Sequence, residues 1–143
     1  MNPLPPGDAL GRVVALFRAL SANGDWRDRP AWLRFAAHAA VLCPLDPDDT
    51  AARIRAAALR LRRDAGWFSD LSSPLRFVIA AMVVQDGVDP AQFGEELARD
   101  HERLRIAGLR HGGRYETLAI AILRHLARGP IPSEQIMGLK AMY

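Results

Sequence analysis

The sequence predicts an all-α protein of stacked antiparallel helical hairpins, a helical bundle or short solenoid of about seven helices. Glycines recur at a spacing of 42 residues, at Gly24, Gly66 and Gly108. Prolines recur at spacings of 42 or 43 residues, at Pro5, Pro47, Pro90 and Pro132. The triplet Leu33-Arg34-Phe35 returns 42 residues later as Leu75-Arg76-Phe77. A fixed period of this length is typical of helical hairpins that bury their apolar faces against neighbouring repeats.

Length and composition predict one domain that spans residues 1–143. Half of the 143 residues are hydrophobic and 24% are charged, as in ordinary globular proteins. All 19 basic residues except Lys140 are arginine, but the net charge is only +3, which is weak support for nucleic-acid binding. Cys43 is the single cysteine, so no internal disulfide can form, and we expect its thiol to be buried. No transmembrane segment or signal-peptide pattern stands out, so we expect a cytoplasmic protein.

The first unit, residues 5–46, predicts a long helix over about 8–22 and a short one over about 30–42. The second unit, residues 47–89, predicts a long helix that begins with Asp46 as N-cap and Pro47 at its first position. This helix is expected to run to residue 65 and to stop at Gly66. Ser73 and Pro74 predict the start of a short apolar helix that ends at Gly87.

The third unit, residues 90–131, repeats this order. Asp89 and Pro90 predict the start of a long helix to residue 107, and Gly108 its end. A short apolar helix is expected over residues 115–126. A partial fourth unit, residues 132–143, carries an apolar stripe formed by Ile136, Met137, Leu139 and Met142. The stripe predicts either that the natural chain continues or that this end docks on a partner.

The middle and end of the chain resemble a family of uncharacterised bacterial helical proteins, known as a domain of unknown function. The resemblance covers about residues 67–143, and its motifs are residues 65–69, 76–82, 104–108 and 118–123. It implies a helical fold and a chain that extends further. It carries no catalytic or binding residue, so it leaves the function open.

The loops after the long helices predict a binding ridge, because equivalent loops align in stacked hairpins. Aromatic and arginine side chains dominate many protein interfaces. The candidate binding residues are Trp26, Trp67, Phe68, Arg110, His111, Arg114 and Tyr115. The alternative is that Trp67 and Phe68 pack back onto the hairpin as hydrophobic plugs.

No motif in the sequence predicts catalysis, a metal site or a cofactor. The four histidines do not share close spacings, and His38 lies among alanines, which predicts a core histidine. Asp100, His101 and Glu102 point about 100° apart on a helix, so we expect them to form a solvated face. The sequence therefore favours a non-enzymatic protein with no catalytic residue.

The sequence favours a helical scaffold that binds another protein or a second copy of itself. One alternative is nucleic-acid binding by the arginines of the second long helix, Arg53, Arg55, Arg60, Arg62 and Arg63. Another alternative is a small-molecule or metal site near His101, His111 and Tyr115.

Overall fold

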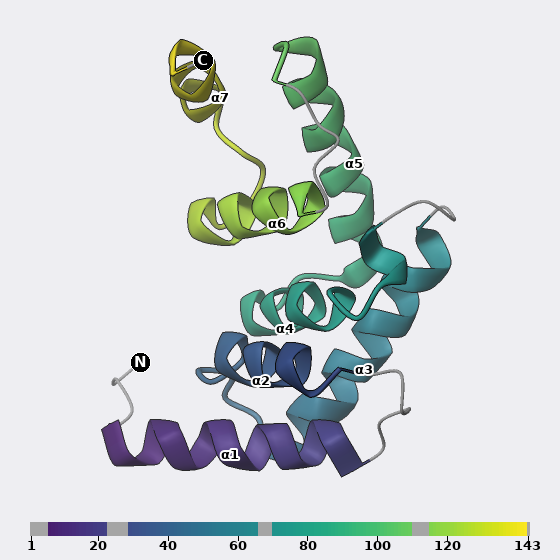
Figure 1. The fold of residues 1–143 in the computed structure, drawn as a ribbon, viewed down its shortest axis with the longest axis vertical. Helices are drawn as coiled ribbons and strands as arrows, with labels where there is room; N and C mark the ends of the chain where they lie inside the picture. The colour runs from purple at the N-terminus through teal and green to yellow at the C-terminus, as the bar shows by residue number, and fades with distance from the viewer. Residues whose placement is uncertain (1–5, 23–28, 66–69, 110–114, 143) are drawn as a thin grey trace.

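The computed structural model describes residues 6–22, 29–65, 70–109 and 115–142. In this part of the chain there are seven α-helices, one 3₁₀ turn and no β-strand (Figure 1). In chain order they are α1 (Pro6–Ala22), α2 (Pro30–Ala39), α3 (Pro47–Asp64), the 3₁₀ turn η1 (Asp70–Ser72), α4 (Arg76–Asp86), α5 (Pro90–Ile106), α6 (Glu116–Ala127) and α7 (Ser133–Ala141). The all-α class is thereby confirmed. None of the described helices has the length and apolar character needed to cross a bilayer.

The short helices α2, α4 and α6 lie one above another and run in the same direction (Figure 1). The long helices α3 and α5 run alongside this column, α1 lies across its lower end, and α7 lies beyond α6. Helix α4 packs on both α2 and α3, and α6 packs on α4 and α5. The column therefore has two edges, one where the short helices begin and one where they end.

The core lies where α1, α2, α3 and α4 meet. Its largest fully buried apolar side chains include Leu16 and Leu20 of α1, Ile54 and Leu61 of α3, and Ile79 of α4. Alanines fill the contacts between them and let the helix axes approach closely, at positions Ala36, Ala37, Ala40, Ala57, Ala58, Ala80 and Ala81. Helix α4 is buried on most sides, as its apolar sequence predicts.

The two long helices α3 and α5 begin at the predicted caps. Asp46 Oδ1 accepts a hydrogen bond of 2.9 Å from the backbone N–H of Asp49, and Asp89 Oδ2 accepts one of 3.1 Å from that of Gln92. A proline follows each cap. The bond from Asp49 to the carboxylate lowers the pKa of Asp46, because it stabilises the charged form.

The start of α4 differs from the prediction, because the helix begins at Arg76 and not at Ser73 and Pro74. The backbone N–H groups of Arg76 and Phe77 bond to carbonyls three residues back, at 3.1 Å each. Ser73 Oγ accepts from Leu75 N at 3.3 Å. The serine and proline therefore form a tight turn that leads into the helix.

Glycines mark the ends of two predicted helices. Gly87 follows α4 with φ +66°, and Gly108 lies just beyond α5 with φ +79°. Helix α6 ends at Ala127, one residue beyond the expected bound of 126, and Arg128 follows it in the left-handed conformation with φ 57°. The predicted stop at Gly66 lies outside the described residues.

The predicted apolar stripe of the last helix is wrong in part. Ile136 is buried, whereas Met137 and Met142 are 70% and 81% exposed. Arg103 of α5 donates to the carbonyl of Ile131 at 2.7 Å and to Ser133 Oγ at 3.2 Å, which fixes the segment that leads into α7. Ile136 is therefore part of the packed core and the two methionines face outward.

Candidate functional site

Of the seven predicted binding residues, the structure describes Tyr115. It is the residue before α6 and is 53% exposed, on the edge where the short helices begin. The other six lie outside the described residues: Trp26, Trp67, Phe68, Arg110, His111 and Arg114. Their placement on a ridge therefore stays a prediction.

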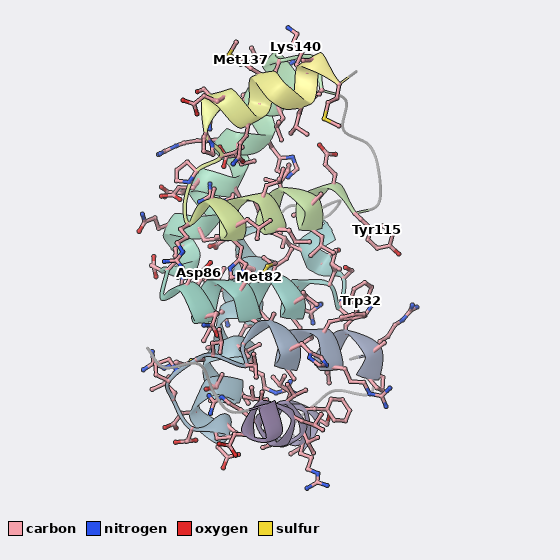
Figure 2. The ribbon with its side chains drawn as sticks, turned by 90° about the vertical axis from the view of Figure 1, so that its left-hand side faces the viewer. Trp32, Met82, Asp86, Tyr115, Met137 and Lys140 are labelled. Atoms are coloured by element: carbon pink, nitrogen blue, oxygen red, sulfur yellow. The ribbon has the colours of Figure 1, made fainter. Side chains whose placement is uncertain are left out.

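Tyr115 belongs to a group of three aromatic rings, in which Phe35 and Tyr115 are exposed and Trp32 is half-buried. The centroid of the Trp32 ring lies 6.5 Å from that of Tyr115 and 5.9 Å from that of Phe35, with interplanar angles of 45° and 47°. Such tilted pairs at this separation are favourable aromatic contacts. Figure 2 shows Trp32 of α2 and Tyr115, just before α6, on the same side of the molecule. We call Trp32, Phe35 and Tyr115 the aromatic edge.

Phe35 is the most exposed ring of the aromatic edge, at 59%. It belongs to the repeated Leu-Arg-Phe triplet, whose second copy ends in Phe77. Phe77 is only 4% exposed and packs in the core. The same three residues therefore bury one phenylalanine and expose the other, because α4 is buried on most sides whereas α2 buries one face.

The sequence predicts a possible small-molecule or metal site near His101, His111 and Tyr115. In the structure, His101 lies close to the start of α6. Its Nδ1 atom is 3.6 Å from Oε1 of Glu116. His111 lies outside the described residues. Within residues 6–22, 29–65, 70–109 and 115–142, no group of three or more histidine, cysteine or acidic residues is placed to hold a metal ion.

The arginines of α3 form a largely solvated surface. Arg53, Arg60, Arg62 and Arg63 are exposed, and Arg60 Nε lies 2.9 Å from Oδ2 of Asp64. This pair raises the pKa of Arg60. Arg55 is half-buried, and its guanidinium lies 5.7 Å from the centroid of the Phe77 ring. The arginines of α3 therefore do not form a continuous positive surface, because Arg60 pairs with Asp64 and Arg55 packs against Phe77.

The prediction of a solvated face at residues 100–102 is wrong for Asp100, which is 1% exposed. Its Oδ2 atom accepts a hydrogen bond of 2.6 Å from Arg124 Nη1 and one of 3.2 Å from the backbone N–H of Ile131. Its Oδ1 atom accepts one of 2.8 Å from Arg103. A buried carboxylate requires such partners, because an unpaired charge in the interior is costly.

Arg124 joins two acidic residues of α5 to α6. Its Nη2 atom donates to Glu96, and its guanidinium also lies 5.3 Å from the centroid of the Phe93 ring. The pKa of Glu96 is lowered, first by a hydrogen bond from the side chain of Gln92 and further by Arg124. Asp100, Glu96 and Arg124 therefore form a charge network between the two helices.

The prediction that His38 is a core residue is wrong, because its side chain is exposed at the end of α2. The alanines beside it, Ala36 and Ala37, take the buried face. His125 of α6 lies 2.8 Å from Asp86 Oδ2, through its Nδ1 atom. Both histidines therefore stand at the edge where the short helices end.

None of the family models, curated proteins or solved structures compared with this chain matches it. The resemblance over residues 67–143 therefore stays a prediction.

Proposed function

We propose that this protein is a non-enzymatic helical scaffold that binds another protein through the aromatic edge. The observation that carries the proposal is the exposure of Phe35 and Tyr115, at 59% and 53%, in contact with the ring of Trp32. Aromatic rings of this kind provide large contact areas with little loss of side-chain freedom, and they dominate the binding energy of many interfaces.

The position of the aromatic edge fits a scaffold of repeated hairpins. In this proposal each unit pairs a long helix with a short one: α1 with α2, α3 with α4, and α5 with α6. The short helices α2, α4 and α6 then begin on the same side of the column, where Trp32 and Tyr115 stand. The six predicted ridge residues that precede α2, α4 and α6 would enlarge this surface.

The buried copy of the triplet supports a functional reason for Phe35. Phe77 shows that the phenylalanine at the third position of the triplet can pack in the core. Phe35 stays outside, although Leu33 beside it is 3% exposed. Since an exposed phenylalanine adds little to folding, a role in binding accounts for its presence together with two other rings.

Site-specific photo-crosslinking tests the proposal in extracts of the source cells. A photoreactive phenylalanine analogue replaces Phe35 in one variant and Ile106, a 72% exposed residue of α5, in a control variant. We expect a discrete protein adduct from position 35. We expect it to disappear when Tyr115→Ala is added and to be absent from position 106.

The same adduct from both positions, or none from position 35, would contradict the proposal. Circular dichroism and thermal unfolding of each variant check that the fold is intact. Light scattering after size exclusion at low and moderate salt then identifies self-association. A dimer that is lost in Phe35→Ala together with Tyr115→Ala would identify a second copy as the partner.

A further inference from the structure

The outward face of α6 is apolar, although it is in contact with solvent. Tyr115, Ala119, Ile122 and Leu126 follow one another at spacings of four, three and four residues, and all are exposed. They lie opposite the buried face of the helix, which carries the charged Arg124. A surface helix normally turns its polar side outward, and this spacing is the one with which helices pair. The outward face of α6 therefore has the pattern of a helix contact.

A second apolar row, formed by Phe35 and Leu42, lies on the same side of the molecule. At one end, Phe35 and Tyr115 both contact the ring of Trp32 in the aromatic edge. At the other end, Leu42 and Leu126 both line a groove of about 910 Å³. The ends of α2, α4 and α6 and the first half of α5 form the walls of this groove. The two rows therefore form one apolar face, which extends from the aromatic edge to the groove.

The two ends of this face are complementary in shape and in charge. The aromatic edge presents the exposed rings of Phe35 and Tyr115, whereas the groove is a hollow with apolar side chains at its rim. The short helices begin at the aromatic edge and end at the groove (Figure 1). Their positive dipole ends are therefore at the aromatic edge and their negative ends at the groove. A second copy that is turned end for end matches both features.

We propose that two copies of this chain pair face to face around a two-fold axis, each placing its aromatic edge on the groove of the other. The inference rests on the proposed function and names the partner of the aromatic edge. Every contact in such a pair occurs twice. Helix α6 then packs antiparallel on α6 of the second copy, with Tyr115 against Leu126 and the small Ala119 against the larger Ile122. Along α2, the ring of Phe35 meets the groove rim of the second copy.

The size of the face determines how strong the pair is. Residues 115–126 span about 17 Å along α6. Helix α4 packs on both α2 and α6, so the face is about 26–30 Å wide across the helices. In projection this is about 450 Å² on each copy, so a pair buries about 900–1,000 Å², close to the lower limit for specific interfaces. We therefore expect a reversible dimer.

One charge also finds a partner in this arrangement. Arg128 follows α6 and is exposed, and within the described parts of the chain no carboxylate forms an ion pair with it. Glu116 lies at the other end of the helix, where its Oε1 atom is 3.6 Å from His101. Antiparallel pairing brings Glu116 of each copy to the end of α6 in the other, beside Arg128. Opposite charges at the two ends of α6 therefore favour the antiparallel pair.

Analytical ultracentrifugation of the purified full chain tests the proposal. We expect the mass to rise from 15.7 kDa toward twice that value as the concentration increases to about 0.5 mM. Leu126→Glu places a charge on the apolar face at a residue that is 73% exposed, and it should weaken the dimer at least about tenfold. Leu59→Glu is the matched control, because Leu59 is 49% exposed on α3 and lies outside the groove lining. Its dimer should equal that of the parent.

Charge reversal tests the direction of the two α6 helices. Arg128→Glu should weaken the dimer about threefold to tenfold, because it places two acidic groups together. Adding Glu116→Arg restores the pair with opposite signs, so the double variant should dimerise more tightly than either single variant. Circular dichroism checks that each variant is folded. A double variant weaker than both single variants would overturn the antiparallel arrangement.

Photo-crosslinking of the purified chain locates the contact. A photoreactive phenylalanine analogue at position 35 should give an adduct of twice the chain mass, with the crosslink near Leu42 of the second copy. A chain that stays monomeric at about 0.5 mM, or equal losses in Leu126→Glu and Leu59→Glu, would overturn the proposal. If the purified chain is monomeric but position 35 captures another protein in extracts, the proposed function stands and the second copy is excluded. If position 35 captures nothing in either sample, both fail.

Discussion

Asp100 of α5 and Arg124 of α6 form a buried ion pair, with 2.6 Å between Oδ2 and Nη1 and side chains that are 2% and 4% exposed. The pair does more than link two helices. Asp100 also accepts from the backbone of Ile131, at the start of the segment that leads to α7. Asp100 therefore helps to orient the last two helices, together with Arg103, which also bonds to this segment.

Arg124→Met is expected to lower the free energy of unfolding by about 3–5 kcal/mol, because it leaves Asp100 buried without its main partner. Urea denaturation followed by circular dichroism measures the loss. Adding Asp100→Asn should restore part of it, since the asparagine is neutral and still accepts from Ile131. Arg99→Met is the control: its pair with Glu95 spans 4.0 Å between exposed side chains, so we expect a change below about 0.5 kcal/mol. If Arg124→Met lowered the free energy of unfolding as little as the Arg99→Met control does, the buried pair would be dispensable.

The caps of α3 and α5 are expected to contribute about 1 kcal/mol each to the free energy of unfolding. Asp46→Ala and Asp89→Ala each remove the acceptor of one backbone N–H. The losses should add in the double variant, because the caps belong to different helices and share no partner. Thermal or urea unfolding gives the values. Asp48→Ala, in the same first turn but without a cap bond, should cost less than Asp46→Ala, and an equal cost would argue against capping.

These caps could be predicted from the sequence because their chemistry is local. An aspartate followed directly by proline satisfies an N–H three residues later, whatever the rest of the fold does. The apolar faces of the helices follow in the same way from their spacing. The predicted start of α4 at Ser73 and Pro74 is wrong, because these two residues suit a tight turn as well as a helix start.

The burial of Asp100 depends on a partner 24 residues away, so its own neighbours in sequence do not reveal it. A signal was nevertheless present. Asp100 lies on the face of α5 that carries Phe93, Leu97 and Leu104, and all four are buried. Arg124 lies likewise on the buried face of α6. Opposite charges on the apolar faces of two successive helices predict a buried pair.

The exposure of Phe35 could also have been read from its helix. The buried residues of α2 are Leu33, Ala36 and Ala37, and Phe35 points away from that face. The repeated triplet does not predict equal burial, because α4 is buried on most sides and α2 on one face. The groove could not be predicted, because its walls come from four helices whose crossing depends on packing.

Glu96 is expected to make stability fall in acid. Its folded-state pKa is lowered, first by Gln92 and then by Arg124, so its contribution is fully present above the unfolded-state pKa of about 4.3. It is lost as the pH falls through the lower folded-state value, because the unfolded chain then binds the extra proton. Urea denaturation from neutral pH to about pH 3 should show a shallower acid decline in Glu96→Gln than in the parent. Glu95→Gln on the exposed face is the control, and an equally shallow decline there would contradict the assignment.

Two glycines with opposite backbone conformations give a final matched test. Gly87 ends α4 with φ +66°, where a side chain is strained although no atom lies within 4 Å of the added Cβ, so Gly87→Ala should cost about 1–2 kcal/mol. Gly94 lies inside α5 with equally open space, so Gly94→Ala should stabilise by up to about 1 kcal/mol. The free energy of unfolding from urea titrations should therefore move in opposite directions. Because the space is open at both positions, a shift in the same direction would mean that backbone conformation at Gly87 does not control the end of α4.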